Sequence, residues 1–184
     1  MFRVRSQLLN VDPVGVVSKH RDLADLSARY DLPFHRLPLA TGAGSEIKRA
    51  QEDRIEAPIA AERVELVVLA RYMQVLSEPF CGILEGRAIN IHHSFLPSFK
   101  GARPYEQARR HGVKLIGATA HYVTAVLDEE PIIEQDVERD DHSLSVADMT
   151  AVGRDVEALV LARAVRWHVE HRVLVNGTKK VVFR

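Results

Sequence analysis

The chain has 184 residues, of which 46% are hydrophobic and 27% charged, a composition typical of globular proteins. It argues against disordered, collagen-like and fibrous classes. Twenty-five Lys and Arg side chains balance twenty-five Asp and Glu, so no net positive charge attracts nucleic acid. With one cysteine, no signal peptide and no membrane-length apolar run, the sequence favours a single cytoplasmic domain without a membrane or nucleic-acid partner.

Short apolar, β-branched runs alternate with helical segments through the first part of the chain. In chain order we expect a strand at 14–17, a helix at 22–30, a strand at 34–37, a helix at 46–54 and a strand at 64–70. The first three elements form a βαβ unit, and Pro58 interrupts or restarts the second helix. Because the strand runs are continuously apolar, they predict an α/β fold with a buried, mostly parallel sheet and helices on both faces.

The second part of the chain continues this alternation and then changes its period. We expect a helix at 79–84, a strand at 88–92, a helix at 105–111, and strands at 113–123 and 132–137, the last two as antiparallel neighbours. From Val146 the apolar spacing predicts a long helix that starts at Ser145, with Asp148 completing an imperfect capping box. The C-terminal stretch 171–183 predicts a hairpin around Asn176 and Gly177.

Polar residues end the strand expected at 88–92, at the edge where open α/β sheets hold ligands. Strand alternation places Asn90 and His92 on one side and Ile91 on the other. An Asn amide can donate to an oxyanion, and an imidazolium can donate a proton or stabilise the same charge. Asp128, in the loop after the next strand, would favour the protonated form of His92 and could position a water. The alternative is that Asn90 and His92 only cap a loop.

Other polar groups suggest weaker alternatives. Nine histidines raise the question of zinc, but no HExxH spacing is present and one cysteine cannot build a thiolate cluster, so no metal is expected. The stretch 41–45 lacks the third glycine and the lysine of a phosphate loop, and it reads as a connection ending in an N-cap at Ser45. Arg71 and Lys100 are either anion clamps or solvated charges.

Three segments closely resemble the formyltetrahydrofolate deformylases, the hydrolase branch of the folate-dependent formyltransferase fold. They are LARYMQVLS at 69–77, INIHHSFLPSFKGARPY at 89–105, and residues 112–124. The resemblance continues through PIIEQ at 131–135 and through 167–183, so it covers nearly the whole chain. It implies a Rossmann-like formyltransferase fold.

The resemblance also implies a reaction, in which water attacks the formyl carbon of 10-formyltetrahydrofolate to give formate and tetrahydrofolate. Asn90 would hold the oxyanion, and His92 would stabilise it and relay a proton to the departing nitrogen. Asp128 would orient His92 and hold the water, and His121 would support this network. Neither a metal nor another cofactor is implied.

The implied partner is a small-molecule folate, and homo-oligomerisation stays open. The backbone of 73–76 and 124–128 would form the pterin slot, with Val75 and Leu76 along its faces. The folate-binding residues expected on this basis are Met73, Gln74, Val75, Leu76, Thr124 and Ala125.

Two departures from the family pattern leave alternatives open. Glu130 stands where family members ordinarily have Gly, which adds strain if the position needs a positive φ. The family also has a strand, a loop and most of a helix before the position of Met1, usually preceded by an ACT domain, so we expect a domain that is N-terminally truncated. The alternatives are formyl transfer to glycinamide ribonucleotide, which needs a phosphate-binding loop after the first strand, and a catalytically inactive folate-binding remnant.

Overall fold

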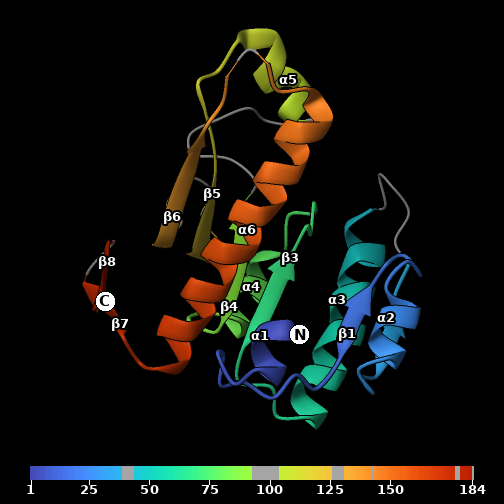
Figure 1. Ribbon diagram of the computed structural model, residues 1–184. Coiled ribbons are helices and arrows are strands. Elements are labelled where there is room, and N and C mark those ends of the chain that lie inside the picture. The colour runs from blue at the N-terminus through green and yellow to red at the C-terminus, as the bar shows by residue number, and fades with distance from the viewer. Residues whose placement is uncertain (39–43, 93–103, 126–130, 142, 177–178, 184) are drawn as a thin grey trace. The chain divides into compact units, whose positions relative to one another are not determined.

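The computed structural model describes residues 1–38, 44–92, 104–125, 131–141, 143–176 and 179–183 (Figure 1). The chain forms two compact units, Met1–Glu65 and Leu66–Arg184. Among the described residues, no helix combines the length and the apolar character needed to cross a membrane.

The first unit contains a parallel strand pair and three helices. Its elements are α1 (Phe2–Arg5), β1 (Val16–Ser18), α2 (Ala24–Ala28), β2 (Phe34–Arg36) and α3 (Ser45–Ala61). β1 and β2 are parallel, with Val16 opposite Phe34, which confirms the expected βαβ unit. The helix expected at 22–30 is shorter than predicted, and regular α-helix covers only Ala24–Ala28.

Two details of α3 correct the sequence-based expectation. The helix runs through Pro58 and ends at Ala61, so the missing N–H of the proline removes one helical hydrogen bond without interrupting the helix. The chain then leaves the helix with Val64 N–H donating to the Ile59 carbonyl at 2.9 Å. Ser45 is the first helical residue and Gly44 the N-cap, so the expected Ser N-cap is wrong by one position.

The second unit is built on a four-stranded sheet in the order β3-β4-β5-β6. The strands are β3 (Val67–Ala70), β4 (Ala88–His92), β5 (Leu115–Tyr122) and β6 (Ile132–Arg139), and α4 (Glu78–Ile83) connects β3 to β4. β3 and β4 are parallel, whereas β5 runs antiparallel to both β4 and β6. The antiparallel pairing expected for the two long strands is therefore confirmed.

Two helices complete this unit, α5 (Pro104–His111) and α6 (Val146–Val169). α6 packs against β4, β5 and β6, and Figure 1 shows it lying along the sheet. Its start has the expected capping box: the Ser145 hydroxyl accepts from the Asp148 N–H at 3.2 Å, and the Ser145 N–H donates to Asp148 Oδ2 at 3.0 Å. Met149, Val156 and Val160 are buried along its inner face.

A close contact joins α5 to α6. The Tyr105 hydroxyl donates to Glu157 Oε1 at 3.1 Å, and a Cβ at Gly153 would overlap that hydroxyl. Burial raises the pKa of Tyr105, with Glu157 adding to the effect and Arg71 opposing it. The missing side chain at Gly153 therefore allows the aromatic ring to lie against α6.

The chain ends in the expected hairpin, β7 (Val173–Asn176) and β8 (Lys179–Val182). The register pairs Asn176 with Lys179, so Asn176 is the last residue of its strand. The expected turn position at Asn176 is therefore wrong by one residue, because the cross-strand pairing extends further than the Asn-Gly signal indicates. Residues 177–178 lie outside the described part.

Candidate active site

One face of the sheet carries the expected catalytic pair. Asn90 and His92 alternate with Ile89 and Ile91 along β4, and both apolar side chains are buried. The β4–β5 register places His121 opposite Asn90. Since opposed residues of an antiparallel pair share a face, His121 lies on the same face as the expected pair.

The opposite face of the sheet is the one covered by α6. Tyr122, next to His121 along β5, places its hydroxyl 2.7 Å from Nδ1 of His168 on α6. Likewise Asp136 of β6 accepts from Arg163 of α6 at 2.7 Å. The Asn90 and His92 side chains therefore project from the face that α6 leaves uncovered.

The hydrogen bonds of His121 fix its tautomer and, through it, the amide of Asn90. His121 Nδ1 lies 3.0 Å from the Tyr122 carbonyl, which can only accept, so we assign the ring hydrogen to Nδ1. In the neutral ring Nε2 then accepts from Asn90 Nδ2, which lies 3.1 Å away. The Asn90 amide is thus oriented by a side chain that is only 3% exposed, and within the described part of the chain its second N–H remains to donate to a ligand oxygen.

His92 is half-buried at the carboxyl end of β4, two residues after Asn90 on the same face. This arrangement brings a fixed amide donor and an imidazole to one face, as the alternation predicts. Asp128 and Glu130 lie outside the described residues, so the expected carboxylate and the position expected to need glycine are not placed. Lys100 lies outside them as well.

The residues expected to bind folate occupy two segments. Met73 and Val75 follow β3 with 64% and 63% of their surfaces exposed, and Gln74 and Leu76 are half-buried. Thr124 and Ala125 follow β5, whose end pairs with the start of β4. The segment 73–76 follows β3, which ends beside the carboxyl end of β4, whereas β5 ends beside the start of β4. The two segments therefore leave the sheet at opposite ends of β4. A ligand that contacts both segments would extend along β4.

Two polar residues of this face, Thr119 and Gln135, were not predicted from the sequence. Thr119 lies opposite His92, and Gln135 of β6 lies opposite Thr119. The signal that could have found Thr119 is a polar residue at every second position of an otherwise small and apolar strand, as in Gly-Ala-Thr-Ala-His at 117–121. That pattern does not show that β6 lies beside β5, so it does not identify Gln135 as the partner of Thr119.

The structure bears on two of the weaker alternatives, the anion clamp at Arg71 and the metal site. Arg71 directly follows β3 with a φ of 55° and an exposed side chain. Within the described part of the chain, no group of three or more His, Cys, Asp or Glu side chains is arranged to hold a metal ion.

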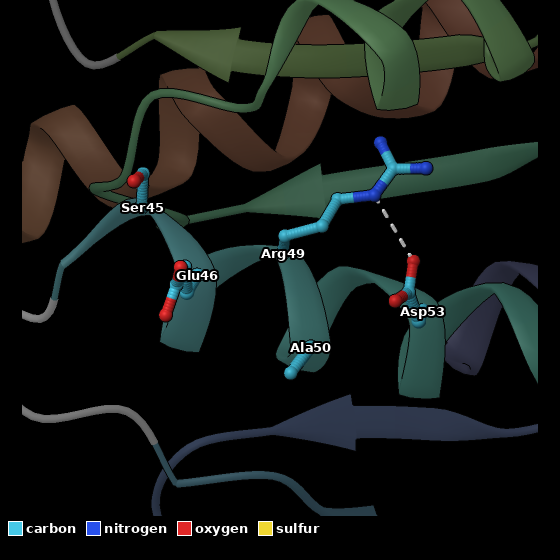
Figure 2. Close-up of a pocket in the computed structure, with 5 residues that line it drawn as sticks. All are labelled: Ser45, Glu46, Arg49, Ala50 and Asp53. Carbon is cyan, nitrogen blue, oxygen red and sulfur yellow. Dashed lines mark ion pairs between the residues drawn. The ribbon is translucent and has the colours of Figure 1, made fainter.

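A pocket in the first unit has no part in this site. Figure 2 shows its lining, Ser45, Glu46, Arg49, Ala50 and Asp53, all from α3. Arg49 forms an ion pair with Asp53 at 3.1 Å, one helical turn away. The depression is therefore a surface of one helix whose charges are partly paired, and none of the expected site residues lines it.

Comparisons with known proteins place the whole arrangement in a family. The family model described as formyl transferase matches residues 2–165. The chain belongs to the formyl transferase family. This membership confirms the α/β formyltransferase fold expected from the sequence.

The similar proteins include several named formyltetrahydrofolate deformylase. The one from Corynebacterium sp. (strain P-1) is 49% identical over all of this chain and 63% of its own length. The one from Mycobacterium tuberculosis (strain ATCC 25618 / H37Rv) is 49% identical over all of this chain and 57% of its own length. The chain thus spans about 57% to 63% of these relatives.

Solved structures give the same result. A formyltetrahydrofolate deformylase from Burkholderia mallei superposes with a TM-score of 0.90 at 54% identity, covering all of this chain and 64% of the other. A glycinamide ribonucleotide transformylase from Symbiobacterium toebii gives a TM-score of 0.88 at 28% identity, covering all of this chain and 86% of the other. The deformylase is the more similar of these two.

Proposed function

We propose that the chain acts as a formyltetrahydrofolate deformylase, hydrolysing 10-formyltetrahydrofolate to formate and tetrahydrofolate for one-carbon and purine metabolism. The observation that carries the proposal is the Asn90 amide, held by His121 on the face that also presents His92. The names of relatives at 49% identity support hydrolysis over transfer.

The proposed reaction begins with the attack of water on the formyl carbon. Asp128 holds the water and takes its proton as the new C–O bond forms and the carbonyl electron pair moves onto oxygen. The second Asn90 N–H and the His92 imidazolium stabilise this oxyanion. The electron pair then reforms the carbonyl, the C–N bond breaks, and His92 gives its proton to N10.

The proposed folate site runs along β4. Met73, Gln74, Val75 and Leu76 contact one part of the substrate, and Thr124 and Ala125 contact another, which an elongated reduced folate can reach. The proposed chemistry needs neither a metal nor another cofactor, because a formyl amide is activated here by hydrogen bonds and a proton donor. The single cysteine, which cannot form a disulfide within the chain, supports a cytoplasmic location.

A second candidate is formyl transfer to glycinamide ribonucleotide, favoured by the TM-score of 0.88 with the Symbiobacterium toebii transformylase. The two reactions share an oxyanion site and differ in the nucleophile. Formate release from 10-formyltetrahydrofolate is therefore measured with and without glycinamide ribonucleotide. We expect release without the acceptor and no faster consumption when it is added.

Two results would contradict the proposed function. Faster consumption with glycinamide ribonucleotide, accompanied by formylated product, would assign the chain as a transferase. Binding of a reduced folate by titration, without release of formate or formyl transfer, would identify an inactive folate-binding protein.

A further inference from the structure

A second polar pair extends the site's face across the sheet. The antiparallel registers place Thr119 opposite His92, and Gln135 opposite Thr119. Opposed residues of an antiparallel pair share a face, with Cβ atoms about 5 Å apart. The row His92, Thr119 and Gln135 therefore crosses three strands beside the row formed by Asn90 and His121.

The Thr119 hydroxyl is held from the β6 side. Gln135 Nε2 donates to Thr119 Oγ1 at 2.9 Å, and Thr119 is 0% exposed. A hydroxyl has one hydrogen to donate, and because an amide N–H already approaches Oγ1, that hydrogen points away from Gln135. A buried polar side chain is costly unless it is bonded, so this pair has one strongly favoured arrangement.

Close packing of the two strands restricts the pair further. Gly117 lies two residues before Thr119, and a Cβ there would come within 2.6 Å of the Asp136 carbonyl oxygen. β5 and β6 thus approach each other more closely than a side chain at Gly117 would allow. This proximity holds the backbone of β6 next to Gln135 close to β5.

We propose that Thr119 and Gln135 are positioning residues for His92, in which Gln135 orients the Thr119 hydroxyl and Thr119 fixes the imidazole on the face that it shares with Asn90. The inference rests on the proposed function, in which Asn90 and His92 must reach the same formyl oxygen. Neither positioning residue touches the reacting atoms. A displacement of about 1 Å in such a group lowers a rate about 100-fold.

The kinetic test compares three variants with a matched control. Thr119→Val and Gln135→Leu each remove one partner of the hydrogen bond, and Thr119→Ser keeps the hydroxyl. We expect the first two to lower kcat roughly 10- to 100-fold with KM nearly unchanged, and Thr119→Ser to retain most of the activity. Glu138→Gln, on the exposed side of β6, is the control and should behave as the parent chain.

A spectroscopic test does not depend on turnover. In the chain with ¹⁵N-labelled histidine, the ring signals of His92 are assigned by their loss in His92→Gln. We expect these ring shifts to move in Thr119→Val and Gln135→Leu and to stay in place in Glu138→Gln. If the parent chain releases no formate, the proposed function fails while these shifts still decide whether the pair positions His92.

Two results would overturn the inference. The first is Thr119→Val with parental His92 ring shifts, since the hydroxyl would then have no effect on the imidazole. The second is Thr119→Ser losing as much activity as Thr119→Val, which would assign the effect to packing of the missing methyl group. Circular dichroism confirms that each variant is folded, and Gln135→Leu tests the same bond if Thr119→Val is not.

Discussion

Among the described residues, the Asn90 amide donates one hydrogen bond, to His121, and its second N–H can donate to a substrate oxygen. His121, which fixes this amide, is buried, so the donor is already oriented before a ligand binds. A preorganised donor contributes more to a transition state than a mobile one, because no reorganisation accompanies the reaction. The value of this residue therefore lies in its fixed orientation as much as in its chemistry.

Removing this donor should affect turnover more than binding. We expect Asn90→Ala to lower kcat for formate release by roughly 10² to 10³, with little change in folate affinity. His92→Ala should be similarly severe. Steady-state kinetics and a folate titration measure the two effects, and Asn176→Ala, an exposed Asn at the end of β7, serves as the control.

The double variant tests whether the two residues act on one oxygen. Because Asn90 and His92 would stabilise the same charge, the combined loss should be smaller than the product of the single losses. Strictly multiplicative losses would show that the two side chains act at separate points of the reaction.

At the level of strands and helices, the sheet depends on one position without a side chain. A Cβ at Gly117 would come 2.6 Å from the Asp136 carbonyl oxygen and 2.9 Å from Val137 Cγ1. The first of these atoms belongs to the backbone, so rotation of a side chain cannot relieve the overlap. Pairing of β5 with β6 therefore requires glycine at this position.

We expect Gly117→Ala to destabilise the fold by about 1 to 3 kcal/mol, because β6 must move away from β5. Denaturant unfolding followed by circular dichroism measures the change. Gly82→Ala is the matched control, since a Cβ there meets nothing within 4 Å and lies in α4, where alanine is the better helix former. Equal stabilities of the two variants would disprove the close approach of the strands.

The contact between β5 and α6 carries a pH dependence. The Tyr122 hydroxyl lies 2.7 Å from His168 Nδ1, and burial, followed by the charge of His171, lowers the pKa of His168 from its ordinary 6.5. On the same ring, Lys180 Nζ lies 5.9 Å from the centroid of Tyr122. The folded state thus favours the neutral imidazole.

This shift makes the folded state less stable at mildly acidic pH. As the pH falls through about 6.5, the unfolded chain takes up a proton at His168 that the folded chain resists, so unfolding becomes more favourable. We expect the Tm difference between pH 7.5 and 5.5 to shrink in His168→Gln. His35→Gln, an exposed His in β2, should leave that difference unchanged. A larger difference in His168→Gln would contradict the sign of the shift.

The sequence predicts these elements well where the signal is local. The strand at 88–92 matches β4 residue for residue, and the Ser145 start of α6 is confirmed, because apolar runs and caps act over a few neighbouring residues. Pro58 was misjudged because the loss of one helical hydrogen bond at a proline does not end this helix, which continues to Ala61. The orientation of Asn90 by His121 depends on the register of β5 against β4, which no local pattern specifies.

At the scale of the whole molecule, every residue assigned to the proposed chemistry and folate site falls within Leu66–Arg184. A ligand at 100 times its Kd stabilises the state that binds it by about 2.7 kcal/mol. Hydrogen exchange with a non-hydrolysable 10-formylfolate analogue should therefore slow mainly in residues 71–76 and in β4 and β5. Exchange in β1 and β2 should change less, and Asn90→Ala should show the same pattern, since this variant is expected to keep its affinity. Slowing concentrated in the first unit would place the folate on other residues and overturn the assignment of 73–76 and 124–125.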